Sequence, residues 1–246
     1  DQGLDFSRRL AEGGRRIIAP SRFGYLRSDY PADPSSQNQA DAFVDLLDHL
    51  GIDKLPVLGG SAGALSAIEF ALRHPDRCSA LIALVPASYT PGRPRTPGPS
   101  GLQEAVMQEV LGSDFLFWLG LQTIPSRMIG TLLATDPGLV DAAAPVERER
   151  VRAILWNILP VSRRSRGLLN DAKLASNPAP MELERIAAPT LAVSLDDDRF
   201  GTAAAARHLA NTVPGARLVV YPTGGHVWVG RDRELFAEVG AFMASL

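Results

Sequence analysis

The hydrophobic residues of this chain occur both in short continuous runs and in longer stretches where they recur every three or four positions. The continuous runs predict buried strands at residues 15–20, 55–58, 80–85, 190–195 and 217–221. The periodic stretches predict helices at roughly residues 4–12, 40–50, 64–74, 202–211 and 233–246. Such alternation is typical of an α/β protein, with a mostly parallel twisted sheet covered by helices on both faces.

The alternation is interrupted in the middle of the chain. Residues 86–99 contain five prolines and predict an exposed, stiff linker. Residues 101–176 then show helical periodicity without a convincing strand, and they carry several aromatic side chains. We therefore expect residues 1–88 and 186–246 to form the core and residues 89–185 to form a linker and an inserted helical cap.

Composition narrows the classes of partner. A chain of 246 residues that is 46% hydrophobic can bury one sizeable core. Its 25 basic and 27 acidic residues give a net charge of -2, which favours neither nucleic acid nor an anionic membrane as a partner. No apolar run reaches the roughly 18 residues of a membrane span. The single cysteine, Cys78, fits a packing role, and the cytoplasm is slightly favoured while the compartment and oligomeric state stay open.

The strongest chemical signal is the segment 59–63, which reads G-G-S-A-G between a predicted strand and a predicted helix. This is the G-x-S-x-G pattern in the setting that a nucleophilic serine requires. A turn this sharp tolerates no bulky side chain two residues before or after the serine, and Gly59 and Gly63 meet that demand. The amide of Ala62 is then placed to stabilise an oxyanion. The alternatives are an ordinary glycine-rich loop between strand and helix, or a phosphate-binding loop, but the lysine of a P-loop and the G-x-G-x-x-G spacing are missing.

A serine nucleophile needs a base, and His226 is the best candidate among four histidines. It follows a predicted strand within a loop whose glycines allow close approach to another loop. The remaining histidines lie in or at the end of predicted helices, at positions His49, His74 and His208. A carboxylate must orient the imidazole, and residues 196–198, all aspartates, follow a strand whose carboxyl end should lie at the same edge of the sheet.

These segments resemble those of the α/β-hydrolase superfamily, in which the triad order is Ser, Asp, His. Residues 21–28 are similar to the family's loop after its fourth strand, with Ser21 and Leu26 as departures, and residues 74–77 are similar to its approach to the sixth strand. The resemblance places the triad acid at Asp198, with Asp197 as the second choice and Asp196 as a solvated turn residue.

The resemblance implies attack by Ser61 on a carbonyl, an acyl-enzyme, and no metal or organic cofactor. A carboxylic ester with a small or medium apolar group is the expected substrate. C–C bond hydrolases, cofactor-free haloperoxidases and peptidases share this triad, and a non-catalytic ligand receptor with the same fold is a further alternative. Caps in this family resemble lids, so Phe115, Trp118 and Trp156, together with Trp228, are candidate pocket walls. Packing within the protein is their other possible role.

The resemblance also bears on the start of the chain. In the family, a loop after the third strand supplies a second oxyanion donor, and the strand at residues 15–20 corresponds to an element beyond that loop. We therefore expect the first three strands and the second donor to lie upstream of Asp1. The alternative is a smaller sheet, in which residues 15–20 pair directly with residues 55–59 and only half an oxyanion hole exists.

Overall fold

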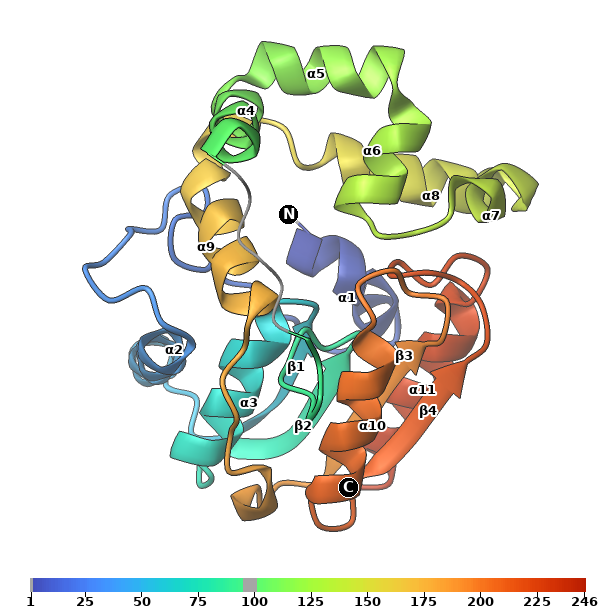
Figure 1. The fold of residues 1–246 in the computed structure, drawn as a ribbon. Helices are drawn as coiled ribbons and strands as arrows, with labels where there is room; N and C mark the ends of the chain where they lie inside the picture. Colours follow the sequence, from blue (N-terminus) through green and yellow to red (C-terminus); the bar gives the residue numbers. More distant parts are fainter. Residues whose placement is uncertain (1, 95–100) are drawn as a thin grey trace.

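The computed structural model describes residues 2–94 and 101–246 (Figure 1). Four strands form one parallel sheet in the order β1-β2-β3-β4. The strands are β1 (Leu55–Gly60), β2 (Cys78–Leu84), β3 (Thr190–Leu195) and β4 (Arg217–Tyr221). The register pairs Gly60 with Leu84 and Leu84 with Val193, so the carboxyl ends of the strands lie together at one edge.

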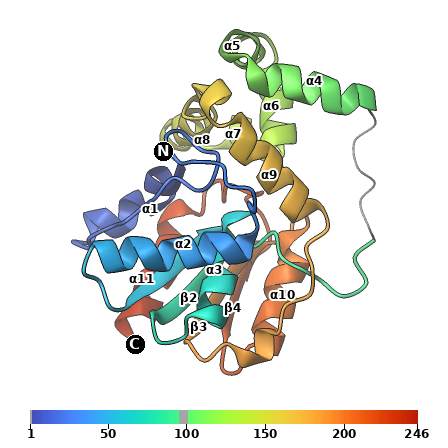
Figure 2. The same cartoon turned by 90° about the vertical axis from the view of Figure 1, so that its left-hand side faces the viewer.

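Helices cover both faces of the sheet, as Figures 1 and 2 show. The core helices are α1 (Gln2–Glu12), α2 (Ser36–His49), α3 (Gly63–Arg73), α10 (Thr202–Thr212) and α11 (Asp232–Ala244). Helices α3 and α10 pack directly on one face, with α2 outside α3, and α1 packs with α11 on the other. The predicted arrangement, a parallel sheet between two helical layers, is confirmed.

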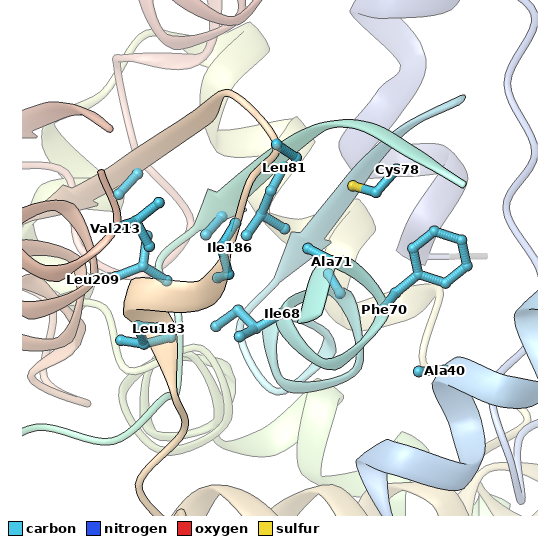
Figure 3. Close-up of a cluster of buried hydrophobic side chains, with 14 of the residues drawn as sticks. Ala40, Ile68, Phe70, Ala71, Cys78, Leu81, Leu183, Ile186, Leu209 and Val213 are labelled. Atoms are coloured by element: carbon cyan, nitrogen blue, oxygen red, sulfur yellow. The ribbon is translucent and has the colours of Figure 1, made fainter. Parts of the chain in front are cut away.

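Burial on both faces explains why β2 reads as a continuous apolar run. Leu81 packs into the cluster beneath α3 and α10 (Figure 3). Ala83 packs into the same cluster, whereas Ile82 and Leu84 pack into the cluster beneath α11. Cys78 belongs to the first cluster, and burial raises the pKa of its thiol to about 11. A thiol held protonated in this way has a packing role.

Between β2 and β3, every regular element in residues 85–94 and 101–189 is helical. These elements are α4 (Gly101–Gly112), α5 (Asp114–Thr123), α6 (Pro125–Leu132), α7 (Pro137–Ala142), α8 (Pro145–Trp156), η1 (Val161–Arg163), α9 (Ser165–Ser176) and η2 (Leu183–Arg185). Most of them lie as a cap over the carboxyl edge of the sheet (Figure 1). An apolar cluster that includes Phe117, Leu121 and Ile154 of the cap also takes in Val227 and Val229 of the core. Across the portion of the chain that the structure describes, no helix is both long and apolar enough to traverse a bilayer.

The strand predicted at residues 15–20 is wrong. These residues follow α1 without regular structure, and the only ladder that β1 makes with described residues is with β2. Ile17 nevertheless packs against the apolar cluster on the α11 side of the sheet. The apolar pattern at residues 15–20 therefore indicates burial but not a strand. A strand also requires a neighbour that completes its hydrogen bonds. The alternative of direct pairing with residues 55–59 is not observed either.

Candidate active site

Ser61 lies in the turn between β1 and α3, with a backbone φ of 52°. This left-handed conformation is unusual for a residue with a side chain, and it presents the hydroxyl above the end of the sheet. A Cβ atom on Gly59 would come within 2.6 Å of the Ala67 Cβ, so residue 59 must be glycine. Gly63 differs from expectation, because a Cβ there would come no closer than 3.8 Å to a neighbouring atom, the Arg22 Nε.

The structure brings Ser61, His226 and Asp198 together from three loops at the carboxyl ends of strands. The His226 Nε2 lies 2.8 Å from the Ser61 Oγ, and the His226 Nδ1 lies 2.8 Å from the Asp198 Oδ2. The Asp198 side chain is fully buried and that of His226 nearly so. These contacts have the geometry of a serine, a base and an orienting acid.

The environment of Asp198 favours its ionised form. Burial alone would raise the pKa of this carboxyl, but hydrogen bonds from His226 and Thr202 and the charge of His226 hold its pKa below the usual value. The second oxygen, Oδ1, accepts the Phe200 amide at 2.9 Å. The site therefore holds a stable negative charge opposite the Nδ1 of the imidazole.

The three consecutive aspartates have three different partners. Asp197, the second choice for the acid, accepts the amides of Gly224 and Gly225 at 3.0 and 2.8 Å and so fixes the loop that carries His226. Asp196 pairs with Arg207 at the surface, as a turn residue would. Only Asp198 of the three hydrogen-bonds the imidazole.

The backbone around Ser61 is held by its neighbours. The Ser61 amide donates to the Leu84 carbonyl at 2.9 Å, and the Ala87 amide donates to the Ser61 carbonyl at 3.1 Å. Ala62 precedes the first residue of α3, where N–H groups lack helical partners, so its amide is available to an oxyanion. The second donor expected upstream of Asp1 stays a prediction.

The cap is tied to the core beside this site. Arg22 donates two hydrogen bonds to Asp171 of α9, and the Tyr25 hydroxyl donates to the same carboxylate. Arg22 and Asp171 line a small cavity together with Ala62. One helix of the cap is thus bound near Ala62, next to Ser61, through a half-buried ion pair.

A second tie joins α8 to the loop of His226. Arg150 donates to the Val227 carbonyl at 2.6 Å, and the Gly230 amide donates to the Glu147 carboxylate at 2.9 Å. Gly225 packs so closely on Thr135 that a Cβ atom would lie 2.6 Å from the threonine side chain. The cap therefore helps to hold the loop that carries His226.

The four aromatic residues predicted as pocket walls do not gather around Ser61. Phe115 and Trp118 stack with 6.0 Å between their ring centres and line an open hollow of 460 Å³, whose other lining residues are Asp114, Leu159 and Pro160. Trp156 is 40% exposed on the cap. Trp228, only 1% exposed, packs in the core against Phe6 and Phe236. Their apolar character alone did not indicate the direction in which each side chain points.

The aromatic ring that does contact the triad is Phe200. It lies edge-to-face with the His226 imidazole at 4.9 Å between ring centres and remains 44% exposed. The sequence analysis did not identify Phe200, although its position two residues after the candidate acid Asp198 indicated that it lies near the site. Phe200 thus presents an exposed apolar ring beside the imidazole of His226.

Comparison with known proteins is consistent with this geometry. The sequence model of a family described as "alpha/beta hydrolase fold" matches residues 3–229. The chain is 26% identical to the "Uncharacterized hydrolase YcgS" of Bacillus subtilis, over 95% of this chain and 82% of that protein. It is 31% identical to "2-hydroxy-6-oxononadienedioate/2-hydroxy-6-oxononatrienedioate hydrolase 1" of Dechloromonas aromatica, over 88% and 72%. A solved "Alpha/beta hydrolase fold protein from Nakamurella multipartita" superposes with a TM-score of 0.69 at 26% identity, over 98% and 86%.

Proposed function

This chain belongs to the alpha/beta hydrolase fold family, and we propose that this hydrolase cleaves carboxylic esters with Ser61 as its nucleophile. The observation that carries the proposal is the continuous contact from the Ser61 Oγ through His226 to the buried Asp198, with 2.8 Å at each step. A serine hydroxyl is a weak nucleophile by itself, and this arrangement supplies the base that activates it.

In the proposed reaction, the His226 Nε2 takes the hydroxyl proton as the Ser61 Oγ forms a bond to the carbonyl carbon of the ester. The carbonyl π electrons move to oxygen, where the Ala62 amide stabilises the negative charge. As the tetrahedral intermediate collapses, the C–O bond to the alcohol breaks and His226 protonates the leaving oxygen. A water molecule, deprotonated by His226, then attacks the acyl-enzyme and releases the acid and free Ser61.

Charge at the site favours an uncharged substrate. Arg22, the cationic residue in the small cavity next to Ala62, is already neutralised by Asp171. Arg150, at the loop of His226, is paired with Glu147. A substrate with a carboxylate would have to compete for these partners, whereas a small or medium apolar group can pack on Phe200.

C–C bond hydrolysis is the second candidate, because the Dechloromonas aromatica relative is named as a hydrolase of 2-hydroxy-6-oxo compounds, which contain no ester or amide bond to cleave. The name of that relative describes a dioate, which carries two carboxylates. The same nucleophile and base would serve both reactions, so the charge and shape of the substrate decide between them.

The decisive experiment is labelling with a fluorophosphonate, followed by turnover of a series of p-nitrophenyl esters. We expect stoichiometric phosphonylation of the peptide that contains Ser61, and ester hydrolysis that is lost on labelling. Ser61→Ala is the control for both. Labelling without ester turnover, together with cleavage of 2-hydroxy-6-oxo-6-phenylhexa-2,4-dienoate, would support the second candidate. An unlabelled wild-type protein that binds ligands without turnover would indicate the receptor alternative.

A further inference from the structure

Behind Asp198, a line of buried hydroxyl groups continues into the core. The Ser194 Oγ, near the end of β3, lies 2.9 Å from the Thr202 Oγ1 at the start of α10. The Thr202 hydroxyl in turn donates to the Asp198 Oδ2, the oxygen that also faces His226. Five side chains, from Ser194 to Ser61, are therefore joined by hydrogen bonds.

The direction of each hydrogen bond follows from the count of protons. An ionised carboxylate only accepts, so the Thr202 hydroxyl must donate its single proton to Asp198. Thr202 can then only accept from Ser194, whose hydroxyl proton must point toward it. On the other side of Asp198, the His226 Nδ1 must carry a proton, which leaves Nε2 free to accept from Ser61.

Burial makes this line of hydroxyls hard to replace. Thr202 is 2% exposed, and neither Ser194 nor the Asp198 side chain is accessible to solvent. If the threonine hydroxyl were removed, bulk water would not reach the Asp198 Oδ2 without opening the core. Among the described residues, the carboxylate would then keep the Phe200 amide and His226 as its donors.

We propose that Thr202 is a positioning residue, whose hydroxyl, oriented by Ser194, holds the Asp198 Oδ2 opposite the His226 Nδ1. The inference rests on the proposed serine hydrolase function. Thr202 acts through Asp198 and does not touch the reacting atoms. A purely structural threonine at the start of α10 would affect stability without changing the reactivity of Ser61.

The test compares Thr202→Val with Thr202→Ser by the rate constant for labelling with a fluorophosphonate and by kcat and KM for an ester. Valine keeps the shape and removes the hydroxyl, whereas serine keeps the hydroxyl. We expect Thr202→Val to slow labelling and kcat by about 10- to 100-fold, as for the loss of a hydrogen bond to a charged group, with little change in KM. Thr202→Ser should stay within about threefold, and Ser194→Ala should lose roughly two- to tenfold.

Thr190→Val is the matched control. Thr190 begins the same strand as Ser194, is equally buried, and donates to the Ala188 carbonyl at the opposite end of β3 from the triad. It should lower thermal stability as Thr202→Val does, without slowing the labelling of Ser61. If Thr202→Val does not fold, Thr202→Ala removes the same hydroxyl with less crowding.

The inference is overturned if the folded variant without the hydroxyl labels within twofold of wild type, or if Thr202→Ser is as slow as Thr202→Val. The downfield proton resonance of the His226 Nδ1–H gives a reading that needs no substrate, and it should shift in Thr202→Val but not in Thr190→Val. Absence of labelling in the wild type would instead contradict the proposed function, so the two failures are distinguishable.

Discussion

The carboxyl edge of the sheet and the outer helix of the cap, α5, use side chains in opposite ways. At the sheet edge, Asp198 and His226 are buried, and each has partners at hydrogen-bond distance. On α5, Phe115 is 64% exposed and Trp118 lies beside it, while Phe117 and Leu121 pack toward the cap's interior. The arrangement at the sheet edge depends on the positions of a few polar atoms. The outer face of α5, in contrast, places no polar group against Ser61.

The largest expected effect comes from removing the nucleophile at the sheet edge. Ser61→Ala should lower kcat by about 10⁴-fold or more, because the triad acts as a unit. Steady-state kinetics on an ester, with circular dichroism to check folding, measures it. Ser66→Ala is the control, since the hydroxyl of this serine in α3 donates to the Gly63 carbonyl and not to His226. Equal activity of Ser61→Ala and Ser66→Ala would contradict the proposed mechanism.

The next effect separates two neighbouring carboxylates. Asp198→Asn should lower kcat by roughly 10³- to 10⁴-fold, because an amide facing Nδ1 favours the wrong tautomer of His226. Asp197→Asn should cost much less, about tenfold, because its partners are the amides of Gly224 and Gly225. The ratio of the two kcat values is the measurement. The reverse ranking would reassign the acid to Asp197.

The tie between cap and core is expected to act on stability more than on chemistry. Asp171→Asn weakens the ion pair with Arg22 and the hydrogen bond from Tyr25, so the free energy of unfolding should fall by on the order of 2 kcal/mol. Chemical denaturation measures this loss. Asp41→Asn is a matched control, because Asp41 also pairs with an arginine, Arg73, but at an exposed site. A loss in Asp171→Asn below about 0.5 kcal/mol, as for an exposed pair, would show that α9 is not anchored by this pair.

Asp198 also links stability to pH. Its pKa is lower in the folded protein than in the unfolded chain, so the ionised group stabilises the fold fully above about pH 4. This contribution is lost as the pH falls from there through the lowered pKa. The difference in Tm between wild type and Asp198→Asn should therefore shrink in acid. A difference that is constant from neutral pH to pH 3 would show that the charge of Asp198 does not stabilise the fold.

The sequence correctly predicted those strands whose apolar run also has a neighbouring strand to pair with. The strands at residues 190–195 and 217–221 were found at these positions, because β3 pairs with β2 and β4 on its two sides and β4 pairs with β3. Residues 15–20 carried the same apolar signal but have no such neighbour, and a sequence pattern cannot report pairing. Local periodicity therefore indicates burial, and the ladder decides whether a buried segment is a strand.

At the candidate site, too, the sequence revealed residues required by local geometry but not those defined by contacts between distant segments. The turn at Ser61 and the glycines before His226 were readable, because sharp turns demand particular residues. Phe200 and Thr202 were missed, since neither belongs to a motif and their contacts with His226 and Asp198 depend on how α10 begins. Pocket walls were predicted from aromatic residues of a cap that resembles a lid, and neither feature specifies where a side chain points.

The smallest expected effect lies on the outer face of α5. The double variant Phe115→Ala, Trp118→Ala should keep kcat/KM for a short ester within about twofold of wild type. Both rings line a hollow bounded by Leu159 and Pro160, and no residue of the triad lines it. Phe200→Ala is the comparison, because this ring contacts His226. Loss of about 1 kcal/mol of apolar contact with the substrate should raise KM several-fold. Kinetics on esters of increasing acyl length measures both. If the double variant loses as much as Phe200→Ala, and more with longer chains, the substrate extends across the cap, and α5 takes part in binding after all.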